Sequence, residues 1–342
     1  MKNKHINIPI FIPHLGCPND CVFCNQRIIS GVSEFDPNSV IPLIEEALST
    51  IEEGADAQIA FFGGSFTGID RNLMEELLKI ANRYLNQGRI HSIRCSTRPD
   101  YINDEILDIL TSYGVDTVEL GIQSTSDSVL RKCARGHTSE ASAIACRKIK
   151  DRAMALGGQM MIGLPGATID DELNTAKFIV DSGADEARIY PTIVFKQTKL
   201  CRMTESGSYT PLSVDDAVKR AAAVFSVFVN AGVKVLRVGL CDSENLHNDT
   251  TYFAGPNHAA MGELVEGEYY FTAINEKIGK LDRLAGGRIT VFAAKGHTSK
   301  VIGQNKKNKI RLLERYSFSD FKVVEDPKMK AYEISLKIEE RI

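Results

Sequence analysis

No apolar run in this 342-residue sequence approaches the roughly 18 residues that a membrane-spanning helix needs. The start of the chain is also poor in apolar residues, since residues 1–5 lead into a short apolar stretch at 8–12 that is too brief for the core of a signal peptide. These absences argue against a membrane span and against export. We therefore expect a protein of the reducing cytoplasm, where its eight cysteines would remain thiols.

The sequence also lacks an excess of charge of one sign, because its formal net charge is only −3. Any nucleic-acid site therefore has to be a local patch. Two stretches concentrate basic residues and are candidate phosphate contacts: Arg131, Lys132, Arg135, Arg147, Lys148, Lys150 and Arg152 in one, and Lys300, Lys306, Lys307, Lys309, Arg311 and Arg315 in the other. The second stretch has no interleaved aromatic residues for base stacking, and a solvated helix face is its alternative interpretation.

A second C-x2-C pair, which zinc ribbons usually have, is missing. Instead Cys17, Cys21 and Cys24 form a C-x3-C-x2-C motif directly after the apolar residues 8–12. A cubane iron–sulfur cluster ordinarily takes four thiolates, so three leave one iron open to a substrate or cofactor. A zinc loop completed by His14 or a distant cysteine is the alternative. Most of the scattered cysteines are expected to be small core residues; they are Cys95, Cys133, Cys146, Cys201 and Cys241.

After the cysteine motif the sequence alternates single apolar strands with capped helices that end at glycine. Strands are expected at residues 58–62, 92–96, 117–122, 159–163 and 187–190, helices at 70–88, 103–114 and 168–183, and a pair of helices at 126–157. With the strand before the cysteines, this alternation predicts six parallel βαβ units and an α/β fold, an incomplete (β/α)6 TIM-type barrel. A doubly wound open sheet is the alternative, and both folds place a site at the carboxyl ends of the strands.

The cysteine motif, with Phe23 before Cys24, resembles the C-x3-C-x-aromatic-C hallmark of the radical S-adenosylmethionine (SAM) superfamily. That resemblance implies an enzyme whose three cysteines bind a [4Fe-4S] cluster and whose SAM fills the open iron. One electron then cleaves SAM to methionine and a 5′-deoxyadenosyl radical. A reductant of the flavodoxin or ferredoxin type is thereby implied as a partner.

The resemblance also implies cofactor-binding residues in the loops after the expected strands. Gly63-Gly64-Ser65 looks like the Gly-Gly-Glu-type loop that holds the SAM amino group, and only its backbone role carries over because serine replaces glutamate. Gln123 lies in a G-x-Q-S element that contacts the ribose. Arg135 opens an R-x-H element, and its guanidinium suits the SAM carboxylate, with a solvated helix-end cation as the alternative. The turn Gly163-Leu164 is expected to support adenine through its backbone.

Segments further along resemble the catalytic subunit of Elongator, the tRNA wobble-uridine modifying enzyme. They are residues 187–200, 207–213, 234–238 and 255–264. This resemblance covers about residues 5–270 and implies tRNA as the first substrate to consider. The chain leaves no room for the acetyltransferase domain of that enzyme, so short bacterial Elongator-like proteins without it are the closer match.

We predict two domains, a radical SAM core at residues 1–240 and a small C-terminal α/β extension at 241–342 that is a candidate substrate-binding element. Strands are expected in the extension at 288–294 and 330–337. Cys241, His247 and His258 are near one another in sequence but match no compact zinc pattern. Two functional alternatives remain: a zinc-stabilised, non-catalytic RNA-binding module, and a radical SAM enzyme that acts on a small molecule or peptide.

Overall fold

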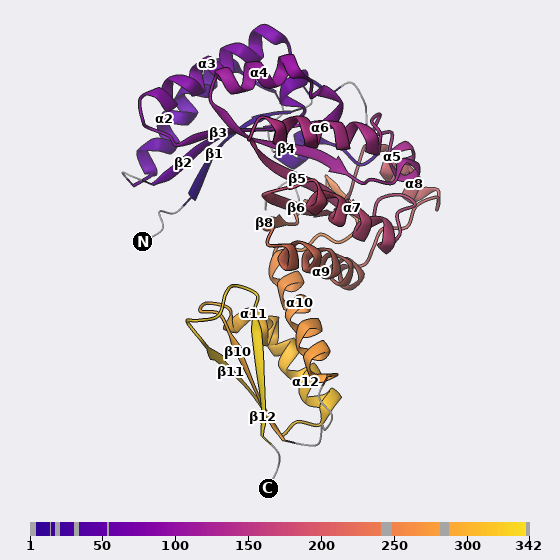
Figure 1. Cartoon of the computed structure of the whole chain (residues 1–342). Helices are drawn as coiled ribbons and strands as arrows, with labels where there is room; N and C mark the ends of the chain where they lie inside the picture. The colour runs from indigo at the N-terminus through magenta and orange to yellow at the C-terminus, as the bar shows by residue number, and fades with distance from the viewer. Residues whose placement is uncertain are drawn as a thin grey trace. The chain divides into compact units, whose positions relative to one another are not determined.

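The computed structural model describes residues 5–13, 15–17, 21–30, 34–52, 55–240, 248–280 and 287–339 (Figure 1). Contacts divide the chain into two compact units. The N-terminal unit comprises residues 1–212 and 233–257, and the C-terminal unit comprises residues 213–232 and 258–342. The contacts therefore group residues 213–232 with the C-terminal unit, and the domain boundary expected at residue 240 stays a prediction.

One parallel sheet of seven strands, in the order β1-β2-β3-β4-β5-β6-β8, forms the body of the N-terminal unit. The strands are β1 (His5–Ile12), β2 (Asp56–Gly63), β3 (Ser92–Thr97), β4 (Val115–Gln123), β5 (Ala155–Ile162), β6 (Glu186–Pro191) and β8 (Lys234–Val238). Within the described residues β1 and β8 do not pair, so the sheet is an incomplete barrel, as predicted. Strand β8 adds a seventh strand to the six units counted in the sequence, and it lies parallel to β6.

Helices connect these strands, and short polar side chains mark their starts. They are α1 (Gln26–Ser30), α2 (Val40–Thr50), α3 (Arg71–Asn86), α4 (Asp104–Ser112), α5 (Asp127–Lys132), α6 (Ser139–Asp151), α7 (Ile169–Asp181) and α8 (Lys199–Glu205). Asp70 and Asn103 accept hydrogen bonds from N–H groups in the first turns of α3 and α4, which satisfies donors that a helix leaves unpaired. At α7, Thr168 and Asp171 form the capping box that their spacing predicts.

The two faces of the parallel sheet differ in chemistry. Helices α3, α4, α6 and α7 pack on its strands (Figure 1), and one face presents a buried apolar row across four strands, made of Phe61, Cys95, Val118 and Leu156. Glu119 follows Val118 and points to the opposite face. There it is buried, with Arg188 Nε at 2.8 Å and Arg94 Nη2 at 2.9 Å. These partners keep the carboxylate ionised, because a buried charge is tolerated only when it is paired.

The pair of helices predicted between residues 126 and 157 is present as α5 and α6, but it ends before Gly157. Helix α6 ends at Asp151, and Ala153 takes a left-handed φ of 57° just beyond it. Gly157 lies inside β5, where a Cβ atom would stand 2.7 Å from Glu119 Cγ. The sequence pattern predicts that a helix ends at this glycine. In the structure its lack of a side chain instead leaves room for the buried Glu119 side chain on the neighbouring strand.

In its described residues the C-terminal unit combines four α-helices with a small mixed sheet. Its elements are α9 (Val214–Ala231), α10 (Met261–Ile278), α11 (Thr298–Ile302) and α12 (Lys307–Tyr316), and β10 (Arg288–Ala293), β11 (Asp320–Glu325) and β12 (Ile334–Glu339). The strand order is β11-β10-β12, and α9 packs against α10. Strand β10 matches the strand predicted at 288–294, whereas β12 begins at Ile334 and overlaps only the second half of the strand predicted at 330–337. Strand β11 was missed because acidic residues begin and end it.

Two further strands, β7 (Val194–Phe195) and β9 (Tyr252–Ala254), pair antiparallel in the N-terminal unit.

None of the helices that the structure describes combines the length and the apolar character that crossing a bilayer requires.

Candidate functional site

The candidate site lies where the first five strands of the parallel sheet end. The carboxyl ends of parallel strands meet at one edge, so the loops after β1 to β5 gather there. The cysteine loop, residues 13–25, follows β1, and its residues 14 and 18–20 lie outside the described residues. Cys21 is buried, while Cys17 and Cys24 are partly exposed.

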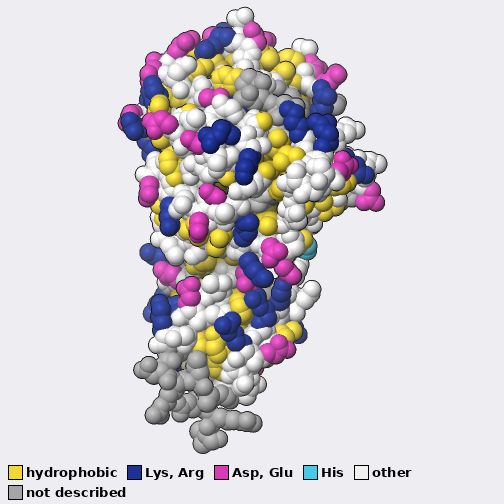
Figure 2. Space-filling view, turned by 90° about the vertical axis from the view of Figure 1, so that its right-hand side faces the viewer, with side chains coloured by type: hydrophobic (Ala, Val, Ile, Leu, Met, Phe, Trp, Pro, Cys, Tyr) yellow, Lys and Arg dark blue, Asp and Glu magenta, His cyan; other side chains and the backbone are white. Residues whose placement is uncertain are grey.

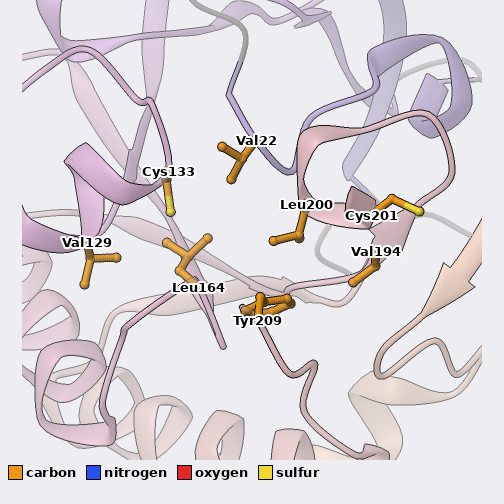
Figure 3. Close-up of a cluster of buried hydrophobic side chains, with 8 residues drawn as sticks. All are labelled: Val22, Val129, Cys133, Leu164, Val194, Leu200, Cys201 and Tyr209. Atoms are coloured by element: carbon orange, nitrogen blue, oxygen red, sulfur yellow. The ribbon is translucent and has the colours of Figure 1, made fainter. Parts of the chain in front are cut away.

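Val22 anchors the cysteine loop in the core of the N-terminal unit. It belongs to a buried cluster with Val129, Cys133, Leu164, Val194, Leu200, Cys201 and Tyr209 (Figure 3). Its N–H donates to the Cys133 carbonyl at 3.1 Å, and its carbonyl accepts from the Leu200 N–H at 2.8 Å. Burying a valine side chain stabilises a fold by about 2 kcal/mol. The residue directly after Cys21 is therefore fixed both by packing and by hydrogen bonds.

The loop after β2 packs closely on the cysteine loop. Gly16 has a φ of 73°, and a Cβ atom there would lie 2.3 Å from the Ser65 carbonyl oxygen. The Ser65 N–H donates to the Leu15 carbonyl at 3.3 Å. Only glycine fits at position 16, because the backbones of the two loops are in contact and the conformation is left-handed.

The predicted SAM-binding loop, Gly63-Gly64-Ser65, faces the cysteine loop with its backbone. The Gly64 N–H donates to the Ile12 carbonyl at 2.9 Å. The Ser65 side chain is fully buried, with Oγ 2.7 Å from Thr97 Oγ1. Its hydroxyl is therefore used inside the protein, and the role predicted for this loop stays with its backbone groups.

Gln123 ends β4 with an acceptor that has no partner. Its φ is 65°, and the strand register shifts between Gly121 and Gln123, a bulge of the kind that re-aims a side chain. Its Oε1 is buried and accepts no hydrogen bond from the described residues. Such an orphaned group costs about 1–3 kcal/mol unless a ligand satisfies it. A hydroxyl donor, as in the predicted ribose contact, would do so.

Arg135 is buried beside the cysteine loop, with 8% of its surface exposed. Its Nη2 donates to the Gly121 carbonyl at 2.6 Å, and its Nη1 lies 3.6 Å from Cys21 Sγ. The alternative of a solvated helix-end cation is therefore wrong. The structure brings this guanidinium to one of the three predicted metal ligands. Its pairing with the SAM carboxylate stays a prediction.

The turn after β5 is held by side chains from two other elements. The Gly163 N–H donates to Glu172 Oε1 at 2.6 Å, and its carbonyl accepts from Tyr209 Oη at 2.7 Å. Leu164 is 2% exposed and packs in the cluster around Val22. The turn that is predicted to support adenine is thus rigid and shares its packing with the cysteine loop.

Cys17 and Cys24 of the cysteine loop are protonated unless a metal centre displaces their protons, because the pKa of each thiol is raised. Burial raises the pKa of Cys24 to about 12, and the neighbouring thiols Cys21 and Cys17 act in the same direction. Burial also raises the pKa of Cys17, which the guanidiniums of Arg135 and Arg98 oppose. A thiol in this state binds a metal only as the thiolate, with release of a proton.

The donor set fits an iron–sulfur cluster better than it fits a hard cation. Within the described part of the chain, no three His, Cys, Asp or Glu side chains are assembled as a metal site. The ligands that the cysteine loop offers are all sulfur, and soft thiolates select iron–sulfur clusters or zinc rather than magnesium or calcium. The orphaned acceptor on Gln123 adds a place for a polar ligand beside them. Cys241 and His247, which the sequence analysis considered as ligands of a second metal, lie outside the described residues.

Sequence reasoning missed two buried residues at this edge, Arg98 and His137. Arg98 directly follows β3 and is 2% exposed, and His137 follows Arg135 by two residues and is 6% exposed. The signal for Arg98 was its position, because residues just beyond a barrel strand face the site. The signal for His137 was the R-x-H element that begins at Arg135.

Comparison with known proteins agrees with this geometry. The profile of the radical SAM superfamily matches residues 11–179, and that of the radical SAM C-terminal domain matches residues 184–270. The "tRNA uridine(34) acetyltransferase" of Methanocaldococcus jannaschii is 30% identical over 158 residues, which are 45% of this chain and 29% of that protein. An uncharacterized protein of the same organism is 30% identical over 224 residues, which are 62% of this chain and 68% of that protein.

A solved structure supports the fold. The Elp3 of the archaeon Methanocaldococcus infernus, with an N-terminal deletion, superposes with a TM-score of 0.62 at 21% identity, covering 82% of this chain and 64% of that one. The chain thus spans less than a third of the first acetyltransferase relative and just under two thirds of the structural one.

Proposed function

Because this chain belongs to the radical SAM superfamily, and is therefore an enzyme that uses a [4Fe-4S] cluster and SAM, we propose that Cys17, Cys21 and Cys24 are the cluster ligands. When bound, the cluster and SAM supply reductive cleavage of SAM to methionine and a 5′-deoxyadenosyl radical. The observation that supports this assignment is the contact between Arg135 and Cys21, which places a buried cation on a predicted ligand.

We assign the remaining loops to binding and orientation of SAM. The backbone groups of Gly63-Gly64-Ser65 bind the amino group of SAM. Gln123 accepts a hydrogen bond from a ribose hydroxyl through its unpartnered Oε1. Arg135 pairs with the carboxylate, and the rigid turn Gly163-Leu164 supports adenine. The buried cluster around Val22 keeps water from the cysteine loop.

Radical SAM chemistry needs a one-electron reductant, and we propose a flavodoxin- or ferredoxin-type protein in the cytoplasm as its source. For the substrate we propose tRNA. The support is the similarity to the tRNA uridine(34) acetyltransferase and to human Elongator complex protein 3, which is 29% identical over 190 residues. A small molecule or a peptide is the alternative substrate class.

The charged surface bears on the tRNA proposal. In the C-terminal unit Lys307 lies 3.3 Å from Asp215, and Arg311 lies 2.5 Å from Glu268. In the N-terminal unit the basic stretch is also paired, through Lys150 with Asp185 for example. Figure 2 shows Lys and Arg side chains interspersed with Asp and Glu on the face in view. Phosphates would therefore have to compete with these ion pairs, of which an exposed one such as Lys307 with Asp215 is worth at most about 1 kcal/mol.

Anaerobic reconstitution tests the cluster assignment. We expect a brown protein with about four irons per chain, which forms 5′-deoxyadenosine slowly from SAM and a reductant without substrate. The Cys21→Ala variant should lose both properties. Cys201→Ala is the matched control, because Cys201 is buried to the same extent, at 6% exposed, and packs in the cluster around Val22.

The control should keep its iron and its deoxyadenosine. A colourless wild-type protein with one tightly bound zinc would instead favour the non-catalytic zinc module. If Cys21→Ala made as much deoxyadenosine as wild type, the ligand assignment would be wrong even in a protein that carries a cluster.

A further inference from the structure

Arg98 connects three loops at the edge of the sheet where the cysteines lie. Its backbone N–H donates to Ser65 Oγ at 3.2 Å, in the loop after β2. Its Nε and Nη2 donate to the two carboxylate oxygens of Asp100 at 2.9 and 2.8 Å. Nη2 also donates to the Arg135 carbonyl at 2.7 Å. A planar guanidinium is suited to this task because its donors are held in a fixed fork.

These contacts form a ring in which the cysteine loop is one side. Gly16 packs on Ser65, Ser65 accepts from Arg98, Arg98 holds the backbone of Arg135, and Arg135 reaches Cys21. Arg98 bonds the Arg135 carbonyl, and the Arg135 guanidinium donates to the Gly121 carbonyl, so Arg98 helps to fix the backbone from which that guanidinium reaches Cys21.

The ring also concentrates positive charge. Both guanidiniums are buried, and Asp100, whose side chain is 29% exposed, is the carboxylate paired with Arg98. The Nη1 of Arg98 is buried without a hydrogen-bond partner among the described residues. Net positive charge is thus placed next to ligands that carry negative charge when a cluster is bound.

We propose that Arg98 is a positioning residue that makes the bound cluster easier to reduce. It does so by holding Arg135 at Cys21 and by adding a second buried cation. Reduction adds one electron from the flavodoxin- or ferredoxin-type donor, with no bond made or broken at that step. Nearby positive charge stabilises the more negative reduced state, and the potential of such clusters follows net charge and hydrogen bonding. This inference rests on the proposed assignment of Cys17, Cys21 and Cys24 as the ligands.

A redox titration of the reconstituted protein, followed by electron paramagnetic resonance, tests the proposal. The Arg98→Gln variant should bind a full complement of iron. The equilibrium constant for one-electron reduction of its cluster should be about tenfold lower, which corresponds to a shift of the reduction potential by about −59 mV. Arg98→Lys restores the charge without the fork and should recover part of that shift. Asp100→Asn removes the opposing carboxylate and should shift the potential upward. Arg89→Gln is the control, since it also removes an arginine that pairs with a carboxylate, Glu45, and it should leave the potential unchanged.

A wild-type potential in a fully loaded Arg98→Gln protein would overturn the inference. If that variant does not fold, Asp100→Asn decides, because an unchanged or lower potential there would contradict the electrostatic argument. A wild-type protein that takes up no cluster would show a different failure, that of the ligand assignment on which the inference rests.

Discussion

His137 is a buried histidine among charged neighbours, and at neutral pH it is itself uncharged. Burial and the guanidiniums of Arg135 and Arg98 together lower its pKa from 6.5 to about 4, although Asp100 acts in the opposite direction. The unfolded chain therefore takes up a proton at this residue at a higher pH than the folded chain does. Between pH 6.5 and pH 4 the proton uptake on unfolding makes the free energy of unfolding fall as the pH falls.

At the residue scale we predict that His137 makes the protein acid-sensitive in that window. The loss should reach about 3 kcal/mol near pH 4, since each pKa unit corresponds to about 1.4 kcal/mol, and it should be absent above pH 6.5. Urea unfolding of the cluster-free protein at pH 7, 5.5 and 4.5 measures it. In the His137→Asn variant the free energy of unfolding should fall less steeply with falling pH, because the proton uptake of His137 on unfolding is missing. An equally steep dependence in that variant would show that other groups cause it.

At the scale of elements, the site depends on a contact between two backbones rather than between side chains. Gly16, in the cysteine loop, has no room for a Cβ atom, because Ser65, Gly68 and Ile69 backbone atoms would lie within 2.7 Å of it. Gly88, after α3, has a similar left-handed φ of 68° but nothing within 4 Å of its Cβ position. The two glycines therefore share the same backbone strain and differ only in packing.

We predict that Gly16→Ala is more destabilising than Gly88→Ala by about 1–3 kcal/mol, the usual cost of overpacking. It should also lower the iron bound after reconstitution, because the cysteine loop must move away from the loop after β2. Denaturant unfolding and iron analysis of both variants measure these effects. Equal stability losses and equal iron contents would show that the contact between the loops is not needed for the site.

At the scale of the whole molecule, the open question is whether the chain binds an anionic polymer. The basic stretch around α12 contributes Lys306, Lys307 and Lys309. Lys307 pairs with Asp215 and Lys309 with Asp320 at 3.9 Å, whereas Lys306 is exposed and makes no ion pair within the described residues. Exposed pairs of this kind are weak, so all three lysines remain able to contact phosphate.

If tRNA is the substrate, its binding should weaken steeply with salt, because phosphate contacts release counterions. Neutralising Lys306, Lys307 and Lys309 together should reduce the slope of log affinity against log salt by up to about three, near one per lost contact. Binding isotherms at several salt concentrations measure the slope. Cluster assembly and substrate-free SAM cleavage should be unchanged in the same variant. An unaltered slope would leave α12 as a solvated face and favour a small-molecule or peptide substrate.

Local interactions explain what the sequence by itself determined about this protein. The caps Asp70, Asn103 and Thr168 each act on an N–H group three residues away, so helix starts could be predicted from neighbours alone. The cysteine motif occupies eight residues directly after a strand, and its spacing was enough to predict the family. The incomplete barrel followed from the alternation of strands and helices, because that alternation leaves few topologies.

Only the tertiary structure decided what surrounds the cysteine loop. Arg135 reaches Cys21 across 114 positions of sequence, and Arg98 reaches Arg135 across 37. Gly157 looked like the end of a helix until the structure showed Glu119 against it. A buried guanidinium or carboxylate is stable only beside its partners, and those partners come from whichever strands become neighbours in the sheet. That choice depends on long-range topology, and no pattern within a single segment of the sequence records it.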